Sequence, residues 1–213
     1  MELKGKKVNF LGDSITEGVG TSCEAAMFPN VIARDASLAE ARNYGLSASR
    51  IARQKLSEDD TCDPRDYCER FAEMDGDADI VIVFGGTNDY GHGNAPFGED
   101  SDRTPDTYCG AVHYLMQGLI KKYPTADIVF LTPIHREGES VPNMHGRILK
   151  DYADEIKIAA EQYSIPVLDL FSVGGIYPQF EGQREAWCPD GLHPNDAGNR
   201  KIADKIIAYL KSI

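Results

Sequence analysis

The chain has 213 residues, of which 42% are hydrophobic and 26% are charged. This length can bury one sizeable hydrophobic core and is short for two, so we expect a single domain over residues 1–213. The formal net charge of −12 disfavours nucleic acids and anionic membranes as partners, because both would repel the protein.

The first predicted strand ends in a Gly-Asp-Ser triplet, within KVNFLGDSITEGVG at residues 7–20. The apolar residues before the triplet are typical of the end of a buried strand, and Gly12 permits a sharp turn. Ser14 would then lie just outside the carboxyl end of the strand, at the rim where open α/β sheets bind ligands. A serine there can be a nucleophile, a phosphate ligand or a helix cap, and this stretch alone leaves all three open.

Four further stretches predict strands that follow the first one. They are ARNYGLS, ADIVIVFGG, ADIVFLTP and IPVLDLF. The runs IVIVF and IVFL are continuously apolar rather than alternating, which is typical of parallel strands covered on both faces. The sequence therefore predicts an α/β fold, a three-layer α/β/α sandwich of flavodoxin-like type with a roughly five-stranded parallel sheet.

Helical patterns alternate with these strands. We predict helices over residues 64–74, 106–123, 146–163 and 195–211. The second of them carries an apolar face that should turn to the sheet, because its apolar residues recur at helical spacing. That face consists of Val112, Leu115, Met116, Leu119 and Ile120. Residues 91–105 and 172–189 are rich in glycine, proline and polar residues and are expected to be long loops beside the functional site.

Polar residues follow the third predicted strand and recur near the end of the chain, in FGGTNDYG at 84–91 and CPDGLHPNDAG at 188–198. Because the carboxyl ends of parallel strands converge on one rim, we expect Ser14, Asn88, Asp190 and His193 to meet there. His193 could then take the serine proton, Asp190 could orient the imidazole, and Asn88 could donate to a developing oxyanion.

Each of these four residues also has a structural interpretation. Ser14 can cap a helix, Asn88 can stabilise its own turn, Asp190 can cap or turn, and His193 can be an ordinary loop histidine. The combination of the four, rather than any one of them, favours nucleophilic catalysis.

The chain resembles the SGNH hydrolases, also called GDSL hydrolases, a family of serine esterases and acylhydrolases with a three-layer α/β/α fold. The resemblance rests on GDSIT, GGTND and DGLHP in this order, and it covers nearly the whole chain. It implies that Ser14 is the nucleophile and that Asp190 and His193 complete the triad. It also implies that the Ser14 backbone N–H and the Asn88 side chain belong to the oxyanion hole, with Gly12 and Asp13 supporting the serine turn.

One block of the sequence departs from the family pattern, which usually reads Asn-x-Gly-x-Ser-Gly. Here NYGLSASR places Ala48 where the family has its last glycine, whose backbone N–H donates to the oxyanion. Alanine keeps that main-chain donor, but a positive φ would cost it energy that glycine does not lose. Gly45, three residues earlier, is a second candidate for the same donor.

These observations predict a serine esterase that cleaves a short-acyl ester, such as an acetyl ester of a carbohydrate, without a cofactor or a metal. The polar loops suit a sugar better than a fatty acyl chain. The alternatives are a lipase or thioesterase of the same family, or a flavodoxin-like module that binds a phosphate or nucleotide at the DSITEG loop. A metal-assisted phosphoesterase using Asp13, Asp89, Asp190 and His193 is a further alternative.

The cysteines and the other histidines give no additional site. The five cysteines are widely spread, without a C-x-x-C pair, and are expected to be reduced structural thiols, although Cys62 and Cys68 could approach each other. No signal peptide or run of about 18 apolar residues is found, so we expect a cytoplasmic protein whose partner is a small ester substrate. Four histidines have no carboxylates at metal-ligand spacing: His92, His113, His135 and His145.

Overall fold

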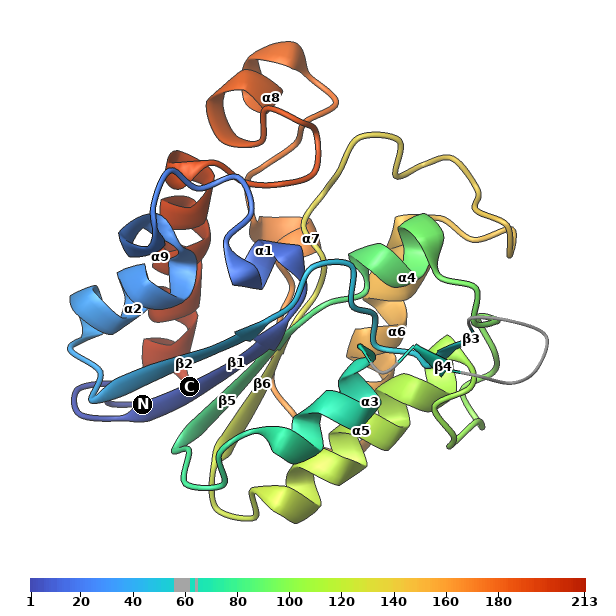
Figure 1. The fold of residues 1–213 in the computed structure, drawn as a ribbon, viewed down its shortest axis with the longest axis horizontal. Helices are drawn as coiled ribbons and strands as arrows, with labels where there is room; N and C mark the ends of the chain where they lie inside the picture. Colours follow the sequence, from blue (N-terminus) through green and yellow to red (C-terminus); the bar gives the residue numbers. More distant parts are fainter. Residues whose placement is uncertain (56–61, 64) are drawn as a thin grey trace.

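The computed structural model describes residues 1–55 and 65–213, together with the backbone of residues 62 and 63. Its centre is the predicted five-stranded parallel sheet, and the strand order is β2-β1-β5-β6-β7 (Figure 1). The five strands are β1 (Lys7–Gly12), β2 (Glu40–Gly45), β5 (Ile80–Phe84), β6 (Asp127–Leu131) and β7 (Val167–Leu168).

The register of the sheet brings the carboxyl ends of β1, β2 and β5 to the same rim. Gly12, at the end of β1, pairs with Gly45 of β2 on one side and with Phe84 of β5 on the other. The segments that follow these three strands therefore begin next to one another, although they are far apart in the sequence.

Helices cover both faces of the sheet, which gives the predicted three layers (Figure 1). On one face α2 (Phe28–Ala36) and α9 (Asp196–Ser212) pack on side chains such as Phe10 of β1. On the other face α5 (Tyr108–Lys122) and α6 (Leu149–Gln162) pack on side chains such as Leu11. Successive residues of β1 thus enter opposite cores, which explains why the strand is continuously apolar.

Three of the four predicted helices form close to their predicted bounds, as α5, α6 and α9. The stretch 64–74 instead contains the four-residue helix α3 (Tyr67–Arg70) and the 3₁₀ turn η2 (Phe71–Glu73), and residue 64 lies outside the described residues. The predicted apolar face of α5 is wrong at one position. Val112, Leu115, Met116 and Leu119 are fully buried, whereas Ile120 is 37% exposed.

Several short elements are absent from the sequence prediction. The stretch 172–189 is not a continuous loop, because it contains α8 (Glu181–Trp187). The predicted loop 91–105 begins with two helical residues, Gly91 and His92, and from residue 93 on it is free of helices and strands as expected. The other unpredicted elements are η1 (Glu24–Ala26), α2, α4 (Thr87–His92), α7 (Leu170–Val173) and the antiparallel pair β3 (Gln54–Lys55) and β4 (Cys62–Asp63). Most of these are shorter than two helical turns, too short to show a period in the sequence.

Four of the cysteines are free thiols, as expected: Cys23, Cys68, Cys109 and Cys188. The thiol of Cys68 is buried and lies 3.3 Å from the carbonyl oxygen of Ile51. The proposed approach of Cys62 to Cys68 cannot be placed, because the side chain of Cys62 lies outside the described residues.

Candidate active site

Ser14 is the first residue of a short helix, α1 (Ser14–Glu17), that starts directly after β1. Asp13 caps this helix, because its Oδ1 accepts a hydrogen bond of 2.9 Å from the Ile15 amide. Gly12 is required by close packing, since a Cβ there would lie 1.9 Å from Thr16 Oγ1. Gly12 and Asp13 therefore hold the serine at the carboxyl rim of the sheet.

Ser14, His193 and Asp190 form a continuous hydrogen-bonded chain. Ser14 Oγ lies 2.9 Å from His193 Nε2, and His193 Nδ1 lies 2.6 Å from Asp190 Oδ2. The other oxygen of Asp190 accepts hydrogen bonds from the amides of Leu192 and His193. This is the arrangement in which a histidine can remove the serine proton while a carboxylate fixes the ring.

The charge of Asp190 suits this position. Its partial burial acts to raise the pKa of the carboxyl group, but hydrogen bonds from the amide and ring of His193 and from the Leu192 amide outweigh it. The pKa of Asp190 is consequently lower than its ordinary value. The group stays ionised near neutral pH and can stabilise a protonated His193.

The Ser14 amide and one amide from the loop after β2, that of Ala48, are the candidate backbone donors. The Leu46 amide donates to the Gly12 carbonyl at 3.1 Å, which ties this loop to the serine turn. Within the described part of the chain, the amides of Ser14 and Ala48 have no hydrogen-bond partner. Ala48 has a φ of 62°, so it adopts the left-handed backbone that glycine would adopt more readily.

Gly45 does not offer a comparable donor. Its amide donates to Asn43 Oδ1 at 2.8 Å and is therefore already occupied. A Cβ at Gly45 would lie 2.1 Å from the Glu17 amide nitrogen, so packing against α1 explains the glycine.

Asn88 lies in the first turn of α4, directly after the end of β5. Its side chain is 3% exposed, and its Nδ2 donates to the Ser49 carbonyl at 3.0 Å. One amide hydrogen thus fixes the side chain against the Ala48 loop, and the second hydrogen on the same nitrogen is left for a ligand.

Three side chains that hold these loops were not predicted for this role from the sequence. Arg70 Nη1 donates to the Gly12 carbonyl at 3.2 Å and to Ser49 Oγ at 3.0 Å, and Nη2 contacts the Tyr44 carbonyl. Asp89 accepts hydrogen bonds from the amides of Ile51 and Ala52, and Glu17 accepts one from the Ser47 amide. Asp89 follows Asn88 directly in GGTND, which is the one local signal that could have suggested its role.

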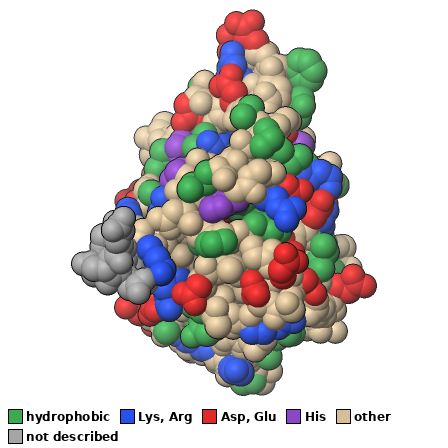
Figure 2. Space-filling model, turned by 90° about the vertical axis from the view of Figure 1, so that its right-hand side faces the viewer, with side chains coloured by type: hydrophobic (Ala, Val, Ile, Leu, Met, Phe, Trp, Pro, Cys, Tyr) green, Lys and Arg blue, Asp and Glu red, His purple; other side chains and the backbone are tan. Residues whose placement is uncertain are grey.

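A small pocket opens at these residues. Its volume is about 250 Å³, and it is lined by Ser14, Val19, Ser47, Ala48, Asn88, His92, Leu192 and His193. Figure 2 views the molecule from the side toward which the strands run, and histidine side chains gather there among hydrophobic ones. The predicted nucleophile, its base and the residues of the predicted oxyanion hole therefore line one pocket.

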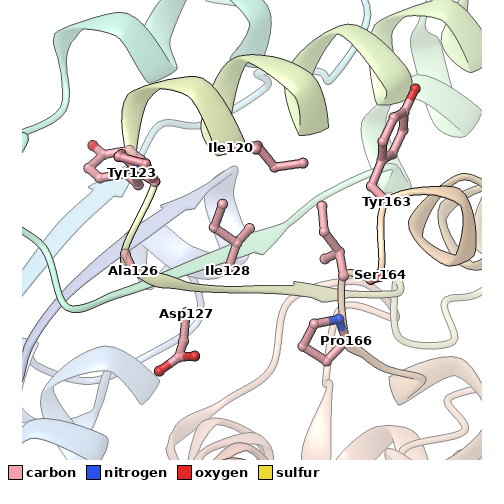
Figure 3. Close-up of a pocket in the computed structure, with 10 residues that line it drawn as sticks. Ile120, Tyr123, Ala126, Asp127, Ile128, Tyr163, Ser164 and Pro166 are labelled. Carbon is pink, nitrogen blue, oxygen red and sulfur yellow. The ribbon is translucent and has the colours of Figure 1, made fainter.

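A pocket of similar size, about 260 Å³, lies at the opposite end of the sheet, around the amino end of β6. Figure 3 shows Ala126, Asp127 and Ile128 at this pocket, with Ile120 of α5 above them. None of the described residues named above for the site lines it, so we place no chemistry there.

The residues of the metal-assisted alternative have other partners. Asp13 caps α1, and both oxygens of Asp89 accept backbone hydrogen bonds of 2.9 and 3.0 Å. Among the described residues, three potential metal ligands come together elsewhere, at Asp100, His113 and Glu155. In the sequence His113 has no carboxylate at ligand spacing, because these carboxylates come from other segments.

No helix within the described residues combines the length and the apolarity needed to cross a membrane.

Comparisons with known proteins show the family and the fold. The model of the GDSL-like lipase/acylhydrolase family matches residues 10–201. A solved protein from Lactobacillus plantarum is 30% identical, with a TM-score of 0.85 over 99% of this chain and 98% of its own. An acetyl xylan esterase is 21% identical, with a TM-score of 0.65 over 96% and 99% of the two chains. A lipase/acylhydrolase from Enterococcus faecalis is 17% identical, with a TM-score of 0.66 over 97% and 96%.

A search of the curated proteins finds no match. The family match spans all three sequence blocks that carry the resemblance, and the structural neighbours share the fold over nearly their whole length. The chain therefore belongs to the GDSL-like lipase/acylhydrolase family and is an ester-hydrolysing enzyme.

Proposed function

We propose that this enzyme hydrolyses short-acyl esters of polar alcohols through an acyl-enzyme formed on Ser14. The observation that carries the proposal is the chain of contacts from Ser14 Oγ to His193 Nε2 at 2.9 Å and from His193 Nδ1 to Asp190 at 2.6 Å. The structural interpretation of Ser14 as a helix cap does not apply, because Asp13 caps α1.

The reaction has two halves. In the first, His193 Nε2 removes the proton from Ser14 Oγ while that oxygen attacks the ester carbonyl carbon. The carbonyl oxygen becomes an oxyanion that accepts hydrogen bonds from the amides of Ser14 and Ala48 and from Asn88 Nδ2. His193 then gives its proton to the leaving alkoxide, so the ester C–O bond breaks and the alcohol departs.

In the second half, a water molecule takes the place of the alcohol. His193 removes a proton from the water as it attacks the acyl carbon on Ser14, and a second oxyanion forms at the same donors. The proton then returns to Ser14 Oγ as the carboxylic acid leaves. Asp190 remains ionised throughout and stabilises the imidazolium in both halves.

The preference for a short acyl group follows from the size and lining of the pocket. A volume of about 250 Å³ accommodates an acetyl group easily, whereas a long acyl chain needs a continuous apolar channel. Of the side chains that line the pocket, Val19 and Leu192 are the larger apolar ones, and Ser47, Asn88 and His92 are polar.

The preference for a polar alcohol is supported by the segment between β7 and His193. Tyr177 and Phe180 are 38% and 67% exposed, and their ring centroids lie 5.5 Å apart. Gln179, between them, donates to the Arg136 carbonyl at 2.8 Å, which anchors this pair of aromatic rings to the loop after β6. Exposed rings beside polar groups suit a sugar, whose faces are apolar and whose edges are polar.

Two measurements test the proposal. A fluorophosphonate probe should label wild-type protein at Ser14 and leave Ser14→Ala unlabelled, and labelling elsewhere would contradict the mechanism. A series of p-nitrophenyl esters, run beside acetylated saccharides, should give the highest kcat/KM for acetate. The acetyl xylan esterase with this fold is the reason to include acetylated xylan among the saccharides.

A higher kcat/KM for octanoate than for acetate would instead favour the lipase or thioesterase alternative within the family. The non-catalytic phosphate-binding alternative gives no reason for the His193–Asp190 contact and is not retained. The cytoplasmic location, the single domain and the exclusion of nucleic acid and membrane partners stay predictions.

A further inference from the structure

A second group of chemically versatile side chains lies in the helical layer formed by α5 and α6, away from the Ser14 pocket. His113 comes from α5, Glu155 from α6 and Asp100 from the segment between α4 and α5. One ligand atom from each residue lies within 4.8 Å of the other two. His113 Nε2 is 3.1 Å from Asp100 Oδ1 and 3.9 Å from Glu155 Oε1.

The Glu155 carboxylate is buried, but one of its oxygens has no hydrogen-bond partner among the described residues. Its residue is only 6% exposed, and Oε1 has no hydrogen-bond partner among the described residues, although the Cys109 thiol donates to the carboxyl group. A buried acceptor left without a partner costs about 1–3 kcal/mol. Glu155 Oε1 therefore lies beside two other potential ligands with its own bonding capacity unused.

Neighbouring side chains hold the other two groups in place. His113 Nδ1 lies 2.9 Å from the Tyr163 hydroxyl, which also accepts a hydrogen bond of 2.9 Å from Gln117. Gln162 donates to both oxygens of Asp100, at 2.9 and 3.1 Å. Metal-binding histidines and carboxylates are commonly oriented by outer partners of this kind.

We propose that Asp100, His113 and Glu155 bind a divalent transition-metal ion, with Zn²⁺ as the best match. Imidazole and carboxylate ligands suit this ion, and Zn–ligand bonds of about 2.0–2.2 Å place neighbouring tetrahedral ligands about 3.5 Å apart. The observed separations of 3.1 and 3.9 Å bracket that value. The two carboxylates neutralise the ion, and the exposed Asp100 leaves a route for entry and a fourth position for water.

The ion would act as a structural link rather than in hydrolysis. It would join α5, α6 and the 93–107 segment, which contains no helix or strand of its own. When His113 binds through Nε2, its proton resides on Nδ1 and is donated to the Tyr163 hydroxyl. The site is independent of the proposed esterase mechanism, so the failure of either proposal leaves the other intact.

Calorimetric titration of the full chain with Zn²⁺ tests this site. We expect one equivalent to bind and the melting temperature to rise, because an ion that binds only the folded state stabilises it. Asp100→Asn and Glu155→Gln should each weaken binding by more than about 10-fold. Removing an outer partner of a ligand already costs about 10–100-fold in metal affinity, and these two residues are ligands. Tyr163→Phe should weaken it by about 10–100-fold.

Two control variants identify competing sites. Glu139→Gln alters the His135–Glu139 pair, whose nitrogen and oxygen are 2.6 Å apart and which no third potential ligand joins among the described residues. His193→Ala removes the histidine of the Ser14 pocket. Both controls should bind Zn²⁺ as the wild type does.

Loss of binding in either control, with Asp100→Asn unaffected, would overturn the proposal, as would the absence of a saturable equivalent in the wild type. Asp100 is 53% exposed at its side chain, so Asp100→Asn should fold normally even if Glu155→Gln does not. Bound Co²⁺ should give visible absorption bands of a nitrogen- and oxygen-coordinated ion, and unchanged bands in Asp100→Asn would also contradict this assignment.

Discussion

The carboxylates around Ser14 fall into two regions that use the same functional group in different ways. At the rim, Asp190 is 55% exposed at its side chain, and its hydrogen bonds hold its pKa below the ordinary value. Beneath the serine, Asp13 and Asp89 are 2% and 4% exposed, and burial raises their pKa values to about 7 and about 6. The rim carboxylate is charged and faces an imidazole, whereas the buried ones hold backbone amides. Burial and partners, rather than residue type, therefore decide which carboxylate can assist catalysis.

The strongest test of this difference is Asp190→Asn. We expect kcat for p-nitrophenyl acetate to fall by about 10⁴-fold, the scale found when the carboxylate of a serine triad becomes an amide. The melting temperature should change little, because the remaining Oδ1 can still accept the amides of Leu192 and His193. Asp196→Asn, at an exposed carboxylate that binds Ser22, is the matched control and should keep its activity. Full activity in Asp190→Asn would remove Asp190 from the proposed mechanism.

A second test concerns Asn88, which adjoins the buried carboxylate Asp89 but faces the pocket. Asn88→Ala should lower kcat by about 10²–10³-fold, with a smaller effect on KM, because the donor matters most once the oxygen carries charge. Steady-state kinetics with the acetate ester measure both constants. An effect confined to KM would mean that Asn88 binds substrate without stabilising an oxyanion.

The buried region predicts an unusual dependence of stability on pH. Because the pKa of Asp13 is raised by burial to about 7, the folded state holds a proton that the unfolded state releases near pH 4. Stability from this group is complete below the unfolded pKa and is lost as the pH rises through about 7. The loss is on the order of 4 kcal/mol, at about 1.4 kcal/mol for each pH unit.

Urea unfolding of wild type and Asp13→Asn between about pH 4 and pH 8 measures this loss. Asparagine can still cap α1 but does not titrate, so the variant should lose less stability over this range. The contribution of Asp89, whose pKa is raised to about 6, should remain in both proteins. Identical pH profiles would show that Asp13 does not hold a proton in the folded state.

The smallest expected effect is that of Ala48→Gly. Glycine would relieve the left-handed strain at a φ of 62°, about 1–2 kcal/mol, but would increase the freedom of the unfolded chain by about 0.4–1 kcal/mol. We expect a net stabilisation of about 0–1.6 kcal/mol and an unchanged kcat, because the amide donor is retained. Gly45→Ala, where a Cβ meets the Glu17 backbone, should instead be clearly destabilising. A large loss of kcat in Ala48→Gly would show that the Ala48 side chain takes part.

The sequence alone was sufficient for the family, the fold class and the five-stranded sheet. Continuous apolar runs such as IVIVF predicted buried parallel strands. GDSIT identified the segment after β1, GGTND the segment after β5, and DGLHP the segment before α9. These signals are local, because a strand, its turn and the polar residue that follows it are adjacent in the chain. The departure at Ala48 could also be read from the sequence, because alanine stands there in place of the family's glycine. The structure then gives this alanine the positive φ that glycine adopts more readily.

The tertiary structure decided everything that depends on burial or on partners far away in the chain. Arg70 reaches Gly12 across 58 positions, and only the folded loop shows that the Gly45 amide already donates to Asn43 Oδ1. No pattern in the neighbouring sequence predicts the raised pKa values of Asp13 and Asp89. The same holds for the exposure of Ile120 and for the contact between His113 and Glu155. Each of them depends on which surfaces the packed helices and strands remove from water, and a linear sequence does not specify that until the chain has folded.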